Sequence, residues 1–201
     1  MRRLSWLGAG RWPRDADVVE LFCGRGSGLL ALARLGFQRI EGVDLSPVLA
    51  GQFQGTAKIH VADCRALPFA SGSKDVLIVQ GGLHHLERLP EDLDRTLDEA
   101  ARVLRPGGRF VTVEPWSTPF LRLAHRLSAI AAVRAISPKM EAFETMYIYE
   151  RETYDRWLAS PDLVLSALHR RFAPERSKTG WGKLYFVGRT PAARGRLRSA
   201  R

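Results

Sequence analysis

The stretch that most constrains the fold is residues 18–28, VVELFCGRGSG, in which an apolar run leads into a turn with three glycines. A second apolar segment follows directly, over residues 29–35. A strand, a glycine turn and a helix in this order build a nucleotide pocket, because glycine lets the backbone approach a ligand closely. The sequence therefore predicts a Rossmann-like α/β domain.

The spacing of these glycines and the acid before them indicate the kind of ligand. A dinucleotide fingerprint reads G-x-G-x-x-G, and its third glycine would fall at position 29, which is a leucine. The chain has Gly24, Gly26 and Gly28 instead, with Glu20 ahead of the turn. A carboxylate at that point repels a pyrophosphate and suits a cationic ligand. The pattern favours S-adenosylmethionine, which carries a sulfonium and an amino group and no phosphate.

From Glu20 to Gly28 the chain resembles motif I of the class I S-adenosylmethionine-dependent methyltransferases, and later stretches resemble further parts of that family in the same order. They are IEGVDLS at 40–46, VAD at 61–63, DVLIVQGGLHHL at 75–86 and LRPGGRF at 104–110. The resemblance covers residues 17–115 and is closest to the branch that methylates small molecules, quinones, sugars and lipids. It implies a seven-stranded, mostly parallel sheet with helices on both faces and an antiparallel C-terminal hairpin.

Strand and helix patterns alternate along the chain, as expected for a parallel sheet covered by helices. Strands are predicted near 17–22, 39–43, 57–62, 75–80 and 108–114, and helices near 27–36, 46–53 and 90–104. Further along, the pattern predicts a long apolar helix over 119–136, then two strands over 164–171 and 183–189 around a Gly-Trp-Gly turn.

The resemblance implies that Asp44 holds the ribose hydroxyls and that Asp63 contacts the adenine amino group. Asp44 also ends a predicted strand, where a Rossmann acid reaches the ribose. A helix cap is the alternative for Asp44, and a local turn is the alternative for Asp63. Phe22 departs from the family pattern, which usually has a glycine there. The expected cofactor residues are Glu20, Phe22, Cys23, Gly24, Gly26, Gly28, Asp44, Leu45, Asp63, Cys64, Gln80 and Gly81.

His84 and His85 follow the fourth predicted strand, at the carboxyl ends of the strands, where such sheets bind ligands. A neutral imidazole accepts a proton near pH 7, so one of the pair is the candidate catalytic base and the other is expected to be structural. Glu114 and Trp116 end the fifth strand and are expected to face the methyl acceptor. Core packing is the alternative for Trp116.

The part of the chain after the fifth strand is expected to cover the acceptor. Residues 137–160 are rich in methionine and aromatic residues and are predicted to form a lid, in which Tyr147 and Tyr149 contact the acceptor; ordinary core packing is the alternative. The helix over 119–136 is expected to bury one face on the sheet, rather than to admit an acceptor from a membrane. We interpret the chain as one domain, 1–201, with a cofactor half at 17–115, an acceptor half at 116–189 and a basic tail at 190–201.

Composition narrows the setting of this domain. The chain has 201 residues, of which 45% are hydrophobic, enough for one domain with its own core. No apolar run approaches the ~20 residues that a membrane-spanning helix needs, and the N-terminus does not read as a signal peptide. We expect a cytoplasmic enzyme in which Cys23 and Cys64 form no disulfide. The spacing of Cys and His is not that of a metal site, so no metal is expected.

The net charge of +10 leaves two interpretations. It indicates an anionic partner such as nucleic acid, or it reflects an arginine-rich composition concentrated in solvated chain ends. The second is favoured, because nearly all the positive charge is arginine and much of it lies at the two termini.

Three functions therefore remain. The leading one is methylation of a small-molecule or lipid-like acceptor. The second is methylation of RNA or DNA, which the net charge favours together with Phe22-Cys23, because this form of motif I resembles some nucleic-acid methyltransferases. The chain has neither an Asn-Pro-Pro-Tyr-type motif nor a Pro-Cys dipeptide, which such enzymes carry. The third is a non-catalytic binding scaffold, which the intact glycines and acids disfavour.

Overall fold

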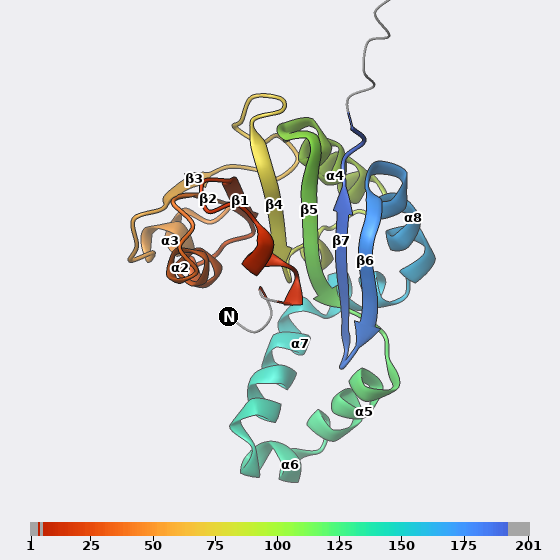
Figure 1. The fold of residues 1–201 in the computed structure, drawn as a ribbon. Helices are drawn as coiled ribbons and strands as arrows, with labels where there is room; N and C mark the ends of the chain where they lie inside the picture. Colours follow the sequence, from red (N-terminus) through yellow and green to blue (C-terminus); the bar gives the residue numbers. More distant parts are fainter. Residues whose placement is uncertain (1–3, 5, 193–201) are drawn as a thin grey trace, which may run out of the picture.

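A computed structural model describes Leu4 and residues 6–192, and its centre is a seven-stranded sheet in the order β3-β2-β1-β4-β5-β7-β6 (Figure 1). The strands β1 to β5 pair in parallel, and β7 runs antiparallel to both β5 and β6. This confirms the predicted fold class. The strands are β1 (Asp17–Leu21), β2 (Arg39–Asp44), β3 (Lys58–Val61), β4 (Lys74–Gln80), β5 (Leu104–Pro115), β6 (Ala173–Gly180) and β7 (Lys183–Arg189).

Helices cover both faces of this sheet. Neighbouring strand residues point to opposite faces, so Val18 and Val19 enter two separate hydrophobic cores. One core includes Leu97 and Leu168 from two helices, and the other includes Leu29 together with the N-terminal segment. The helices are α2 (Ser27–Arg34), α3 (Pro47–Gly51), α4 (Glu91–Val103), α5 (Pro119–Ser128), α6 (Ala131–Ile136), α7 (Pro138–Leu158) and α8 (Pro161–Arg171), with short 3-10 turns η1 (Ala9–Arg11) and η2 (Leu83–His85).

The predicted strand over 164–171 is wrong, because these residues belong to helix α8. Val164, Ala167 and Leu168 are fully buried at the i, i+3, i+4 spacing of one helix face. The predicted terminal hairpin does exist, but β6 supplies its first strand, over 173–180.

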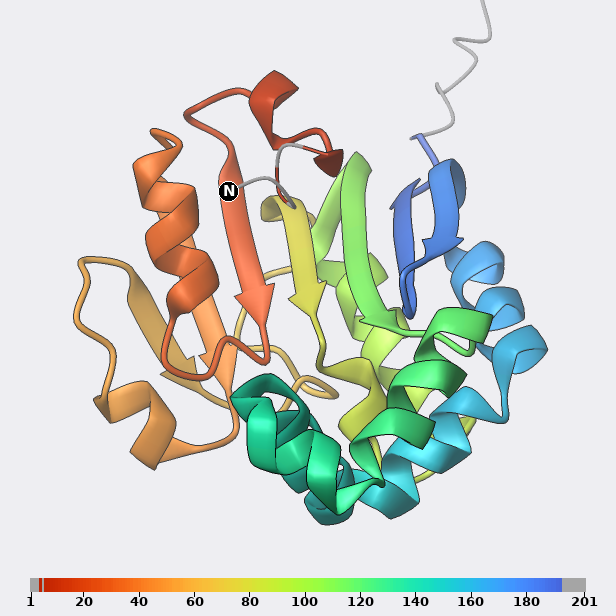
Figure 2. The same ribbon diagram turned by 90° about the horizontal axis from the view of Figure 1, so that it is seen from below.

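The predicted helix over 119–136 is also wrong in part. It divides into α5 and α6, and it does not bury a face on the sheet. Only Leu121 and Ser128 are buried in α5, and α6 has no buried residue. These two helices and α7 instead form a lobe below the carboxyl ends of the parallel strands, which Figure 2 shows from below. The expected lid segment 137–160 is the continuous helix α7 in this lobe.

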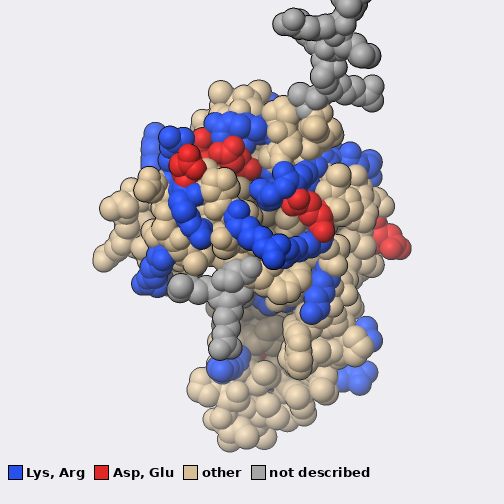
Figure 3. All heavy atoms as spheres, in the orientation of Figure 1, with Lys and Arg blue, Asp and Glu red and all other residues tan. Residues whose placement is uncertain are grey.

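Basic side chains are spread over the sheet half of the molecule, and several lie next to acidic ones (Figure 3). Arg105 pairs with Asp17 and Asp75, and Arg189 pairs with Glu175. These pairs offset positive charge locally, although the net charge of the chain is unchanged by them. The predicted basic tail falls outside the described residues from position 193 onward. Among the helices in the described part, none is long and apolar enough to cross a bilayer.

Candidate active site

A cavity of about 430 Å³ opens where β1 and β2 end, beside the glycine turn. Seven of the twelve predicted cofactor residues line it, and they are Phe22, Gly24, Asp44, Leu45, Asp63, Cys64 and Gly81. The other five, Glu20, Cys23, Gly26, Gly28 and Gln80, do not line this cavity. The structure thus brings residues from four separate stretches of the sequence around one space.

Asp44 ties the glycine turn to the end of β2. Its Oδ2 accepts a hydrogen bond from the backbone N–H of Gly24 at 2.7 Å, and its Oδ1 accepts one from Ser46 at 2.9 Å. The following helix is capped by Ser46, whose Oγ accepts from the N–H of Leu49 at 3.2 Å. The helix-cap alternative for Asp44 is therefore not what the structure shows, and the remaining lone pairs of Asp44 are available to a ligand.

Phe22 stands where the family pattern usually has a glycine, and it adopts a backbone conformation that glycine occupies readily. Its φ is 53°, in the left-handed region that side chains other than glycine rarely occupy. Its ring lies against the backbone of Gly82, where any side chain would clash with it. Gly82, which follows β4, therefore makes room for the phenylalanine that replaces the usual glycine of the turn.

Glu20 is buried beneath the turn. Its Oε1 accepts a hydrogen bond from Gln80 Nε2 at 2.8 Å, whereas its Oε2 is buried with no partner among the described residues. Gly28 leaves room for this carboxylate, because a Cβ there would clash with it. Burial raises the pKa of Glu20 to about 7. A buried carboxylate with a free oxygen favours a cationic partner.

Asp63 makes the local turn that was its alternative interpretation and also lines the cavity. Its Oδ1 accepts from the backbone N–H of Arg65 at 2.8 Å, and its carboxylate pairs with the Arg65 guanidinium at 2.7 Å. The hydrogen bonds from Arg65 hold the pKa of Asp63 below its usual range. Arg65 also reaches Asp92 on α4 at 2.9 Å.

Neither cysteine is an activated nucleophile. Burial raises the pKa of Cys23 to about 12 and that of Cys64 to about 11, so both are protonated thiols at neutral pH. Both are free thiols, as expected.

A second cavity, of about 520 Å³, lies between the carboxyl end of the sheet and the lobe of α5 and α7. Its walls are mostly apolar, and its polar end is formed by Gln80, His84, His85, Glu150 and Tyr154. The apolar lining residues are Val113, Pro115, Phe120, Leu121, Ala124, Met140, Phe143, Met146 and Trp181. Gly81 and His85 line both cavities, so the two spaces are neighbours at these residues.

His84 is held between two carboxylates. Its Nδ1 lies 2.8 Å from Glu114 Oε2, and its Nε2 lies 3.4 Å from Glu150 Oε2. Burial alone would lower the pKa of His84, but Glu114 and Glu150 outweigh it and raise the pKa. Glu114 is fixed in turn, because its Oε1 accepts from the N–H groups of Gly82 and Leu83 at 2.9 and 3.0 Å.

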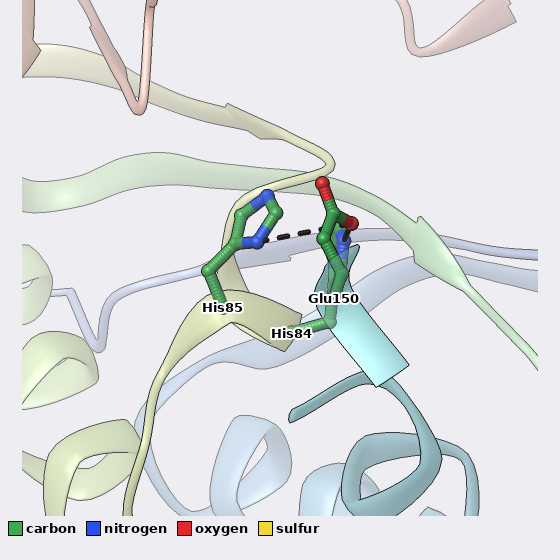
Figure 4. A group of neighbouring side chains, drawn as sticks. All are labelled: His84, His85 and Glu150. Atoms are coloured by element: carbon green, nitrogen blue, oxygen red, sulfur yellow. Dashed lines mark ion pairs between the residues drawn. The ribbon is translucent and has the colours of Figure 1, made fainter. Parts of the chain in front are cut away.

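His85 lies beside His84, and its pKa is shifted in the opposite direction. Burial and the neighbouring His84 lower the pKa of His85, so it stays neutral at physiological pH. Its Nδ1 lies 3.9 Å from Glu150 Oε2, and both imidazoles project from η2 toward that carboxylate on α7 (Figure 4).

His84, His85 and Glu150 are also a possible metal-ligand set, since one ligand atom from each lies within 4.8 Å of the others. The sequence does not indicate this set, because Glu150 lies far along the chain from the two histidines, on helix α7. Metal–ligand bonds of ~2.1 Å place tetrahedral ligands about 3.4 Å apart. The distance of 3.9 Å between His85 Nδ1 and Glu150 Oε2 exceeds that separation. In addition, both ring nitrogens of His84 already contact carboxylates, as expected for a protonated imidazole rather than a metal ligand. We therefore assign no metal to this group.

The chain is similar to known methyltransferases. A family model described as a methyltransferase domain matches residues 19–112. A demethylmenaquinone methyltransferase of Corynebacterium glutamicum is 31% identical over 179 residues, which cover 84% of this chain and 71% of that protein. The chain belongs to the class I S-adenosylmethionine-dependent methyltransferases.

Two further matches show how far this likeness extends. The ubiquinone/menaquinone biosynthesis C-methyltransferase UbiE of Geobacter sulfurreducens is 30% identical over 63% of this chain, which spans only 52% of that relative. A crystal structure of a Pyrococcus horikoshii protein superimposes with a TM-score of 0.69 at 22% identity, over 94% of this chain and 88% of that one. At that identity the structural match shows the fold alone.

The predicted acceptor residues of this methyltransferase are placed differently from the expectation. Glu114 is buried behind His84 and lines neither cavity, and Trp116 packs in the core. Tyr149 is 85% exposed, and Tyr147 bonds to Asp155 at 3.1 Å rather than lining the cavity. The difference lies in which face of α7 each residue occupies, because Glu150 and Tyr154 of the same helix do line the cavity.

Sequence reasoning missed several residues that the cavities use. Glu150 and Tyr154 lie one helical turn apart on α7, in a segment expected to contribute through other tyrosines. Arg65 and Asp92 link the third strand's end to α4. A helical reading of 138–158 at 3.6-residue spacing would have put Phe143, Met146, Glu150 and Tyr154 on one face.

Proposed function

We propose that this methyltransferase moves the methyl group of S-adenosylmethionine, bound in the first cavity, to a small and largely apolar acceptor bound in the second. The observation that supports this most strongly is that Gly81 and His85 line both cavities. Methyl transfer is an in-line displacement, so donor and acceptor must meet end to end. A junction between two cavities provides that arrangement.

The residues of the first cavity fit S-adenosylmethionine. When bound, it supplies a methyl group activated by a positive sulfur. We assign the ribose hydroxyls to Asp44, whose carboxylate is fixed by Gly24 and Ser46. We assign the adenine amino group to Asp63, which lines this cavity, and we assign to Glu20, which is buried beneath the turn and outside the cavity, the shaping of the glycine turn. Phe22 and Leu45 supply apolar contact to the adenine and ribose.

His85 is the residue that we assign as the base. It is neutral because its pKa is lowered, and it lies where the acceptor would meet the donor. Its neutral imidazole takes the proton that a hydroxyl or acidic carbon loses as the new bond to the methyl group forms and the bond from the methyl group to sulfur breaks, and releases that proton to water. We assign His84 as a positioning residue, because its ion pairs with Glu114 and Glu150 fix the orientation of its ring and stabilise its positive charge.

The acceptor class follows from the second cavity. Methionine, phenylalanine and tryptophan side chains form its walls, and a single polar end faces the donor. Such a space fits an apolar molecule with one polar reacting group, and quinone methyltransferases are among the relatives. A nucleotide would require several charged partners for its phosphate, and among the described residues that line the cavity only two are Lys or Arg, namely Lys139 and Lys183.

Filling the second cavity tests this assignment. Ala124 lines it from α5, so Ala124→Trp is expected to reduce methyl transfer into a host lipid extract at least tenfold. Affinity for S-adenosylhomocysteine should stay within threefold, because the first cavity is untouched. Ala142→Trp, at an exposed position of α7, is the matched control and should transfer normally. Full transfer by Ala124→Trp would mean that the acceptor binds elsewhere.

A further inference from the structure

Helix α5 presents an apolar stripe to solvent. Phe120, Leu123 and Leu127 recur at i, i+3 and i+7 and are 47%, 53% and 39% exposed, and Ile130, just beyond the end of α5, is 49% exposed. The opposite side of α5 carries the buried Leu121 and Ser128. A surface helix normally turns its apolar side inward, so the arrangement marks an interaction surface.

The stripe continues onto the turn between β6 and β7. Trp181 is 78% exposed, and its ring centroid lies 5.1 Å from that of Phe120 in an edge-on contact. We call the five residues Phe120, Leu123, Leu127, Ile130 and Trp181 the apolar face. Helix α6 exposes a further apolar side chain, Ile136, which is 84% exposed.

The segment that carries most of the apolar face has charged side chains of one sign only. Residues 115–140 contain no acidic side chain, whereas they contain Arg122, Arg126, Arg134 and Lys139. Arg134 pairs with Glu141, but Arg122 and Arg126 are exposed and flank the stripe. In the view of Figure 3 the lobe below the sheet shows uncharged and basic atoms, and none of its visible described atoms is acidic.

The apolar face borders the mouth of the second cavity. Phe120 and Trp181 are exposed to solvent and also line that cavity, together with Lys139. A molecule on the apolar face can therefore reach the cavity along the side chains of Phe120 and Trp181.

We propose that the apolar face binds the surface of an anionic lipid bilayer and that the acceptor enters the second cavity from the membrane. The route of the acceptor rests on the function proposed above, whereas the contact with the bilayer does not. Tryptophan and phenylalanine beside arginine suit the headgroup boundary, and each arginine gains from anionic lipid. A second copy of the chain fits less well, because a twofold contact would bring the arginines of both copies together.

Sedimentation with vesicles that contain no acceptor tests the bilayer contact alone. Vesicles of phosphatidylcholine and phosphatidylglycerol at 7:3 are expected to bind the full chain at least tenfold more than phosphatidylcholine alone. The triple variant Leu123→Ser/Leu127→Ser/Ile130→Ser should lose that binding at least tenfold, and Arg122→Gln/Arg126→Gln should lose most of the preference for anionic lipid. None of these five residues lines either cavity.

The matched control is Val48→Ser/Val61→Ser. It removes two exposed apolar side chains from α3 and β3, outside the apolar face, and should bind vesicles as the wild type does. Equal binding by the triple variant and the wild type would overturn the inference. So would a wild-type dimer in analytical ultracentrifugation that becomes monomeric in the triple variant, because the face would then join two copies. Transfer to a detergent-dispersed lipid extract separates the two proposals, since it requires the proposed function and no bilayer.

Discussion

Replacing His85 with alanine is expected to lower kcat by ~10²–10⁴, the range that a positioned general base contributes. The reason is its place: His85 lines both cavities, and burial together with His84 lowers its pKa, so it is neutral and ready to accept a proton. His85→Gln should be equally impaired, because an amide keeps a polar contact but accepts no proton at this pH.

The pH profile gives an independent readout. The base works in its neutral form, so activity is lost as pH falls through the pKa of His85, which lies below its usual 6.5. Activity should therefore be level above pH 7. His169→Ala, at an exposed position of α8, is the control and should keep wild-type turnover. Turnover above half of the wild-type value in His85→Ala would show that His85 is not the base.

Replacing Asp44 with alanine should weaken the binding of S-adenosylhomocysteine by about 100-fold or more. The variant loses the proposed bonds to the ribose hydroxyls, and charge-assisted hydrogen bonds contribute ~1.5–3 kcal/mol each. It also leaves the Gly24 N–H without its acceptor, which loosens the turn that shapes the cavity. Isothermal titration calorimetry gives the affinity directly.

Asp15→Ala is the matched control for Asp44, because Asp15 is an exposed carboxylate in the loop before β1. It should bind the ligand as the wild type does. The melting temperature of each variant shows whether the fold survives. A folded Asp44→Ala protein that binds within threefold of the wild type would remove Asp44 from the cofactor site.

The sequence predicts the parallel part of this fold well, and the reason is local. Glycines with positive φ, such as Gly24 and Gly26, and the strand that precedes them fix a turn whose shape depends on few distant contacts. Asp44 follows from the same logic, since a strand end sets its place. The strand β7 is also predicted with its observed bounds, from the residues that follow the Gly-Trp-Gly turn.

The acceptor half is harder to predict because its contacts depend on tertiary structure. Val164, Ala167 and Leu168 fit a short strand or a helix by hydrophobicity, and packing against α4 selects the helix. Glu114 seemed to face the acceptor because it ends β5, but the N–H groups of η2 and the ring of His84 draw it inward. Nothing in the local sequence joins Glu150 to His84, which are 66 positions apart.

The central claim is that methyl groups pass to a small, apolar acceptor, and labelled transfer tests it most directly. Purified protein, methyl-tritiated S-adenosylmethionine and lysate of its own host are incubated together, and label is counted in lipid, aqueous small-molecule, nucleic-acid and protein fractions. The proposed function predicts label in the lipid or small-molecule fraction, with Ala124→Trp reducing it. Label that appears only in nucleic acid or only in protein would contradict the proposal.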